Sequence, residues 1–257
     1  MLFISPHLDD AVLSCGGYIG KLCALGYSVN VVTIFSGSPE GKLSLLAQAL
    51  HLDWRLPKDA PALRREEDQH ALGMLGAEAV HAGFPDCIYR RDPKTGKPVY
   101  TRLGQILAQT AADEPRVVEA VAQYLADLVK ERGFTHAFAP LGLGGHVDHL
   151  ITHAAARLAM ETCTETQWHF YEDLPYAIED APDEKRTHGM RSYVCTRKDG
   201  AEQKYQAMAA YVSQVKSPRY SGGIDIDAIM LYGTERGICA TGFAERAWTE
   251  ARTRSSL

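Results

Sequence analysis

The sequence predicts an α/β fold in which helices cover both faces of a mostly parallel sheet. In the first half of the chain, short β-like runs alternate with segments of helical periodicity, and this alternation is typical of parallel sheets. The chain has 257 residues, of which 46% are hydrophobic and 23% are charged, as in ordinary soluble domains. A chain of this length can bury one sizeable core.

Three segments are predicted to be strands. Leu2–Ile4 is a short apolar run, Val29–Phe35 is rich in β-branched residues, and Thr135–Ala139 is a further short run. Uninterrupted runs of this kind are typical of strands that are buried on both faces of a sheet.

Four segments are predicted to be helices. Ala11–Gly26 carries small and apolar residues at helical spacing and ends at a glycine, which favours helix termination. Leu63–Gly76 has a charged first turn, and Val117–Arg132 places its apolar residues on one face before a further glycine. His149–Met160 is also amphipathic.

The remaining segments suggest how the chain is organised. The stretches Ser36–Ala60 and Asp86–Pro115 are long, polar and rich in glycine and proline, and we expect them to be functional or mobile loops. After about Trp168 the pattern changes to shorter strands and irregular connections. We therefore expect a single domain over residues 1–257, with a three-layer, Rossmann-like core over 1–165 and a smaller, β-containing C-terminal portion over 166–257.

Composition excludes several classes of function. The 27 basic and 32 acidic side chains give a net charge of −5, so there is no positive field to attract nucleic acid or an anionic membrane. No apolar stretch approaches the roughly 18 residues of a membrane span, and the first residues lack the pattern of a signal peptide. The six cysteines form no C-x-x-C pair and are expected to be reduced, mostly buried thiols. We expect a soluble, cytoplasmic enzyme.

Two clusters of polar residues follow predicted strands. The segment PHLDD at residues 6–10 comes directly after the first strand, and GLGGHVDH at residues 142–149 comes after Thr135–Ala139. In an open parallel sheet, ligands bind beyond the carboxyl ends of the strands, near the point where strand order reverses. We therefore expect the two clusters to lie together at one edge of the sheet.

The clusters contain the ligand types of a catalytic zinc site. Such a site takes three protein ligands, often two histidines and one carboxylate, and keeps a position open for water. His7, Asp10 and His149 would supply this set. A metal held in this way lowers the pKa of water toward neutrality.

Three further residues could assist the reaction. Asp9 could accept a proton from the attacking water. His146 could stabilise a developing oxyanion or protonate the leaving group, and Asp148 could hold His146 in one tautomer. Alternatively, Asp9 and Asp10 could simply cap the helix that follows them, and His-x-Asp-His alone is typical of a solvated helix start. Two such clusters at strand ends favour a metal site.

Other metal and cofactor motifs do not match. A zincin motif at His149 and His153 would need glutamate at Leu150, and a metallo-β-lactamase motif would need histidine at Gly144. A dinucleotide-binding fingerprint would need glycine at Val147. We interpret His153 as a helix surface or packing residue, and the glycines of the second cluster as allowing a tight backbone bend.

The two clusters resemble the two hallmark motifs of the PIG-L/LmbE-like deacetylases. These motifs are SPHLDDAVLSCGG at residues 5–17 and GHVDH at residues 145–149. The pattern RxxExxxALxxLG at residues 64–76 resembles an Arg/Glu helix of that family, and GFPD at 83–86 resembles the strand and loop that follow it. The resemblance covers most of Leu2–Tyr176. The chain departs from the common AHPDD sequence by having Leu8 in place of proline, which removes no ligand.

The resemblance implies roles that agree with the chemistry above. His7, Asp10 and His149 match the family's zinc ligands, Asp9 matches its general base, and His146 matches its acid or oxyanion stabiliser. Ferrous iron would suit the same ligands. Relatives often form homo-oligomers.

The resemblance also assigns three supporting residues. Asp148 matches a residue that tunes the second-motif histidine. Arg64 and Asp86 match positions near the bound sugar or phosphate in relatives, although structural ion pairing is an equally open explanation for both.

The leading hypothesis is a zinc-dependent hydrolase that removes an N-acetyl or other small acyl group from an amino-sugar conjugate, such as an N-acetylglucosaminyl compound. One alternative is an amidase of a larger thiol–sugar or natural-product conjugate that uses the same metal site. Another is a sugar- or metal-binding module without catalysis. The expected partner is a small molecule, with no nucleic acid or membrane.

Overall fold

The structure is a computed structural model and describes residues 1–56, 59–107, 110–196, 200–215, 223–237 and 242–250. These residues form one seven-stranded sheet with the strand order β3-β2-β1-β4-β5-β7-β6. The strands are β1 (Leu2–Ser5), β2 (Asn30–Thr33), β3 (Glu78–His81), β4 (His136–Pro140), β5 (Gln167–Tyr171), β6 (Met190–Thr196) and β7 (Ala244–Glu250). The first five strands are parallel, and β7 runs antiparallel to β5 and β6. The mostly parallel α/β sheet expected from the sequence is confirmed.

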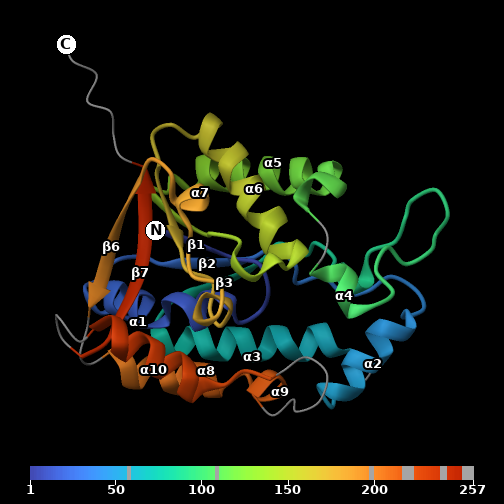
Figure 1. Ribbon diagram of the computed structural model, residues 1–257, viewed down its shortest axis with the longest axis horizontal. Coiled ribbons are helices and arrows are strands. Elements are labelled where there is room, and N and C mark those ends of the chain that lie inside the picture. Colours follow the sequence, from blue (N-terminus) through green and yellow to red (C-terminus); the bar gives the residue numbers. More distant parts are fainter. Residues whose placement is uncertain (57–58, 108–109, 197–199, 216–222, 238–241, 251–257) are drawn as a thin grey trace.

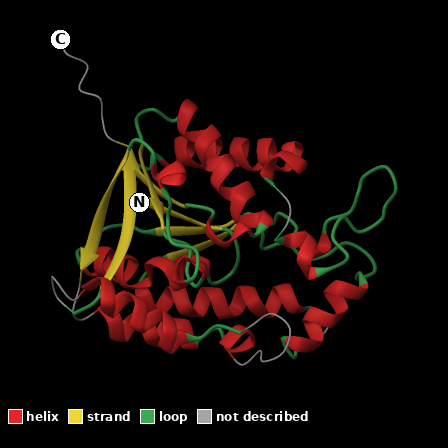
Figure 2. Ribbon diagram, in the orientation of Figure 1, coloured by secondary structure: helices red, strands yellow, loops and turns green. Residues whose placement is uncertain are grey.

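Helices cover both faces of the sheet (Figures 1 and 2). The helices α1, α3, α8 and α10 lie on one side, and α5 and α6 pack together on the other. The longer helices are α1 (Asp10–Ala24), α2 (Leu45–Asp53), α3 (Ala60–Leu75), α5 (Pro115–Arg132), α6 (Val147–Thr162), α8 (Gly200–Ala209) and α10 (Ile226–Gly237). The single-turn helices are α4 (Leu103–Ile106), α7 (Glu184–Thr187) and α9 (Val212–Val215).

The strand order reverses between β1 and β4. From β1 the chain adds β2 and β3 on one side, and it then returns to place β4 and β5 on the other side. β1 is fully buried, with Leu2, Phe3 and Ile4 each at 0% exposure. Because β1 and β4 are neighbours, the loops after them open side by side at the carboxyl edge of the sheet. This is the position that the sequence predicts for a site.

Two predicted loops contain helices. The stretch Ser36–Ala60 carries α2, whose first turn is capped by Ser44 Oγ accepting the N–H of Ala47 at 3.1 Å. The stretch Asp86–Pro115 carries α4 and two 3₁₀ turns. The prediction of loops was therefore wrong in part, because helices of one or two turns carry too few periodic positions to be recognised.

The C-terminal portion is joined to the core by a buried ion pair. Lys204 Nζ of α8 lies 2.8 Å from Glu245 Oε1 of β7, and both side chains are almost completely buried. The Glu245 carboxylate also accepts the backbone N–H groups of Gly17 and Tyr18 in α1, at 2.9 and 2.7 Å. A Cβ on Gly16 would approach Lys204 Cγ to 3.1 Å, so glycine lets α8 pack closely on α1.

The structure also bears on the cysteines and on membrane insertion. Of the described side chains, Cys15, Cys23, Cys87 and Cys163 are free thiols, and all but Cys23 are buried. The side chain of Cys195 and all of Cys239 lie outside the described residues. Across the described ranges, none of the helices combines the length and the apolar character that a bilayer crossing requires.

Candidate active site

The two motifs meet at the reversal point of the sheet. The first runs from the end of β1 into α1, and the second runs from β4 through a 3₁₀ turn, η3 (Leu143–Gly145), into α6. Gly142 and Gly144 both have a φ of 74°, which favours glycine. A Cβ on Gly144 would also overlap the ring of Tyr176. These glycines thus allow the turn that brings the second motif to the first.

The two histidines expected to be metal ligands, His7 and His149, both face one oxygen of the third expected ligand, Asp10. Asp10 Oδ2 lies 3.1 Å from His7 Nδ1 and 3.2 Å from His149 Nε2. His149 Nε2 is buried and makes no hydrogen bond with the residues that the structure describes. Nitrogen atoms of His7, His146 and His149 also lie within 4.8 Å of one another. Two imidazoles and a carboxylate that face one another in this way fit a transition metal, with His146 beside them.

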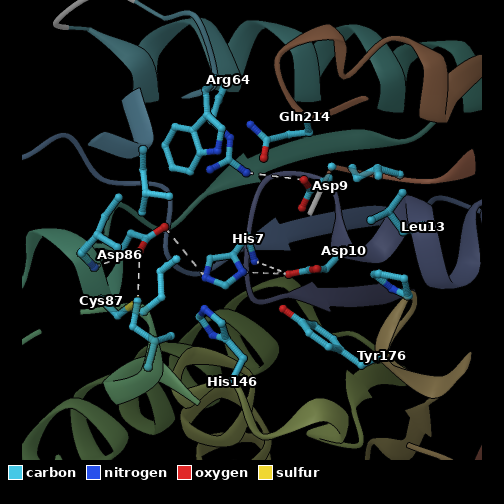
Figure 3. Close-up of a pocket in the computed structure, with 18 of the residues that line it drawn as sticks. His7, Asp9, Asp10, Leu13, Arg64, Asp86, Cys87, His146, Tyr176 and Gln214 are labelled. Atoms are coloured by element: carbon cyan, nitrogen blue, oxygen red, sulfur yellow. Dashed lines mark hydrogen bonds and ion pairs between the residues drawn. The ribbon is translucent and has the colours of Figure 1, made fainter. Parts of the chain in front are cut away.

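Asp9 lies beside this group but faces the pocket (Figure 3). Its side chain makes no capping hydrogen bond to α1, so helix capping does not explain it. Asp9 is 7% exposed, and its carboxylate lies 3.5 Å from the Arg64 guanidinium. Burial and the adjacent Asp10 carboxylate raise the pKa of Asp9 to about 7, although Arg64 opposes the shift.

His146 is held neutral. Burial, together with the neighbouring His7, lowers the pKa of His146 to about 3. Its Nδ1 accepts the backbone N–H of Asp148 at 3.2 Å. This hydrogen bond directs the other ring nitrogen, Nε2, to carry the proton and to act as a donor.

The Asp148 carboxylate contacts His7 rather than His146. It lies 3.0 Å from His7 Nε2, accepts the N–H of Cys87 at 3.0 Å and pairs with the Arg90 guanidinium. Burial alone would raise the pKa of Asp148, but the Arg90 cation and the His7 hydrogen bond hold it well below its usual range. The sequence predicts that the Asp148 side chain holds His146 in one tautomer. In the structure the backbone N–H of Asp148 does so, and the Asp148 side chain orients His7 instead.

Arg64 and Asp86 both line the pocket and both make protein contacts. Arg64 extends from α3 and is 8% exposed, with Asp9 as its ion-pair partner. Asp86 Oδ1 accepts the N–H of Ile88 at 3.1 Å, and Asp86 Oδ2 lies 3.9 Å from His7 Nε2. Their placement in the pocket is compatible with substrate contact, and their protein contacts show that they also have structural partners.

Comparison with known proteins adds an independent observation to this geometry. Residues 2–160 match the PIG-L family, described as GlcNAc-PI de-N-acetylase. The chain belongs to the PIG-L family.

The most similar proteins include deacetylases of antibiotic pathways. A 2'-N-acetylparomamine deacetylase of Streptomyces fradiae is 30% identical over 228 residues, which are 83% of this chain and 72% of the relative. The structure of the zinc-inhibited form of teicoplanin deacetylase Orf2 is 29% identical, with a TM-score of 0.87 over 99% of both chains. A deacetylase–teicoplanin complex is 28% identical, with a TM-score of 0.83 over 96% of both chains. The prediction of a deacetylase-class hydrolase is confirmed.

The pocket of this PIG-L deacetylase has a polar and an apolar side. Its volume is about 380 Å³. The polar side carries His7, Asp9, Asp10, His146 and Arg64 (Figure 3). The apolar side comes largely from α2 and α4 and the residues that follow them: Leu50, Trp54, Leu103, Ile106 and Leu107. The two segments predicted to be loops therefore do border the site.

Sequence reasoning missed three residues at the site of this PIG-L deacetylase. Asp173 Oδ1 lies 2.7 Å from His149 Nδ1, Tyr176 packs edge-on against the His149 ring, and Gln214 of α9 lines the pocket. Asp173 follows the carboxyl end of β5, so the rule that located the two motifs could have located it. Asp173 and Tyr176 also lie in the segment FYEDLPY at residues 170–176, which weakly resembles the family but indicates no role for either residue. No local pattern distinguishes Gln214, because it reaches the site through tertiary packing.

Proposed function

We propose that this protein is a zinc-dependent hydrolase that removes an N-acetyl group from an amino-sugar conjugate. The observation that carries the proposal is the convergence of His7 Nδ1 and His149 Nε2 on Asp10 Oδ2, at a pocket that His7, Asp9 and Asp10 line. The names of the relatives refer to N-acetylparomamine and to teicoplanin, which supports an amide on an amino-sugar conjugate as the substrate.

The residues of the chain suit hydrolysis of an amide. A zinc ion held by His7, Asp10 and His149 would polarise the amide carbonyl and lower the pKa of a water molecule. Asp9 accepts the proton of the attacking water, and its pKa of about 7 places it close to ionisation at neutral pH. Arg64 keeps the Asp9 carboxylate in place through their ion pair.

His146 acts on the other side of the carbonyl. Its neutral ring donates a hydrogen bond to the carbonyl oxygen as negative charge develops there. As the C–N bond breaks, the proton that Asp9 took from water passes to the nitrogen of the leaving amine. Asp148 and Arg90 act indirectly, because they fix the ring of His7 from the side opposite Asp10.

The test is acetate release by the zinc-loaded and the iron(II)-loaded protein from N-acetylglucosamine glycosides. Asp9→Asn should retain metal but lose about 10²- to 10⁴-fold in kcat, the usual contribution of a general base. Turnover of Asp9→Asn at the wild-type rate would exclude this role for Asp9. Metal content of the wild type and of His149→Ala would test the ligand set.

The apolar side of the pocket favours a second candidate, an amidase of a larger conjugate. Leu103 and Leu107 are 38% and 55% exposed, respectively, at the edge of the site, where they could contact a bulky acyl or aglycone group. Rates on N-acetyl and bulky N-acyl versions of one sugar would separate the two candidates. Binding of both without acyl release, in a fully metallated sample, would favour a binding module.

We also propose that the protein works in the cytoplasm and forms a homo-oligomer. The free thiols of Cys15, Cys87 and Cys163 support a reducing compartment. The oligomer is suggested by the resemblance to oligomeric relatives, and light scattering of the purified protein tests it.

A further inference from the structure

The short helix α9 is clamped onto α3. Ser213 donates its backbone N–H to Glu67 Oε1 at 2.8 Å and its hydroxyl to Glu67 Oε2 at 2.6 Å. One residue further along α3, Asp68 Oδ1 accepts the hydroxyl of Tyr211 at 2.7 Å. Asp68 is 2% exposed and Tyr211 is fully buried. Three hydrogen bonds to α3 thus determine where residues 211–213 lie.

The clamp also determines where Gln214 lies. Residues three and four apart share one face of a helix, so Glu67 and Asp68 hold α9 on the same side of α3 from which Arg64 enters the pocket. Gln214 follows the clamped Ser213 and lines the pocket. In Figure 3 its carboxamide lies near Arg64 and Asp9. Its Nε2 donates to Ser213 Oγ at 3.1 Å, which orients the amide.

We propose that Gln214 is a substrate-binding residue that recognises a hydroxyl group of the sugar. This inference rests on the proposed function. A carboxamide both donates and accepts hydrogen bonds, which suits an alcohol. The charged groups near Gln214 already have partners. Arg64 and Asp9 form an ion pair with each other, and the Glu67 carboxylate accepts two hydrogen bonds from Ser213. The surroundings of Gln214 therefore favour a neutral group over a charged one.

Glu67 and Ser213 are then positioning residues. Neither side chain lines the pocket, and both act by holding α9 at a fixed place on α3. Ser213 also receives the hydrogen bond that orients the Gln214 amide. Loss of the Ser213 hydroxyl should therefore weaken substrate binding only because the Gln214 amide loses its orientation.

The first experiment measures acetate release from methyl N-acetylglucosaminide and from its 3-, 4- and 6-deoxy analogues. Gln214→Ala should raise KM about threefold to tenfold, the range for one hydrogen bond, with kcat within about twofold. One deoxy analogue should be poorer than the parent for the wild type but not for Gln214→Ala. Gln206→Ala, which changes an exposed amide of α8 bonded to Glu202, is the matched control and should behave as the wild type.

The second experiment tests the clamp with Ser213→Ala. This variant should raise KM by a similar factor, and Ser213→Ala/Gln214→Ala should be no worse than Gln214→Ala alone, because both changes remove one interaction. Three results would overturn the inference. The first is an unchanged KM for Gln214→Ala, and the second is an equal loss of rate on every deoxy analogue for Gln214→Ala and the wild type. The third is additive effects of Ser213→Ala and Gln214→Ala on KM in the double variant. Absence of acetate release by the wild type would overturn the proposed function, and the inference with it.

Discussion

Asp173 offers a direct test of how the candidate site would hold a metal. Its Oδ1 lies 2.7 Å from His149 Nδ1, and its Oδ2 accepts the N–H of Leu143 at 3.2 Å. Both Asp173 and His149 are at most 1% exposed. The carboxylate therefore accepts a hydrogen bond from Nδ1–H. The proton stays on Nδ1, so Nε2, which faces Asp10, is free to act as a ligand. Asp173→Asn would keep the size of the side chain but place an N–H₂ group against one of these two donors.

The magnitude follows from the role of this hydrogen bond. Loss of a carboxylate that orients a ligating histidine costs about tenfold to a hundredfold in metal affinity, which is about 1.4–2.7 kcal/mol. We expect the zinc affinity of Asp173→Asn to be about tenfold to a hundredfold lower than that of the wild type. Competition with a chromophoric chelator measures this affinity. Because the assay measures binding, it does not depend on the identity of the substrate.

The matched control is Asp180→Asn. Asp180 Oδ2 accepts the N–H of Gly144 at 2.9 Å and pairs with Arg186. It therefore supports the same turn, but within the described part of the chain it makes no hydrogen bond or ion pair with a histidine. The zinc affinity of Asp180→Asn should stay within about threefold of that of the wild type. Equal zinc affinity of Asp173→Asn and the wild type would refute the reasoning, as would an equal loss in both variants.

Three further predictions concern stability. Burial and the neighbouring His136 lower the pKa of His169 to about 4, so the neutral ring stabilises the fold above about pH 6.5 and this contribution is lost as the pH falls toward 4. Between pH 7 and pH 5, metal-free wild type should lose about 2 kcal/mol more free energy of unfolding in urea than His169→Gln; equal losses would contradict this. Glu245→Gln leaves the Lys204 cation buried without its counter-charge and should cost about 3–5 kcal/mol in urea unfolding, whereas a cost below about 1 kcal/mol would contradict a buried pair. Gly144→Ala should lower stability by about 1–3 kcal/mol and reduce activity, since a Cβ meets the Tyr176 ring; unchanged melting and turnover would contradict it.

The sequence by itself determined the class of the fold and where the candidate site lies on it. Hydrophobic periodicity is a local property, so it predicts β1, α1, β4 and α6 to within a few residues of their observed bounds. The ends of β1 and β4 carry the polar motifs, and general topology places such ends together. His7 and His149 could therefore be grouped although they are far apart in the chain.

Only the tertiary structure decided which side chains contact one another. Asp148 is adjacent in sequence to His149, yet its carboxylate contacts His7 and Arg90. Asp173 follows the end of β5, but only the folded chain shows that its carboxylate contacts His149. Gln214 reaches the site from α9, a segment with no motif. Such contacts depend on long-range geometry and on hydrogen bonds available only after burial, whereas residue types and spacing are written in the chain itself.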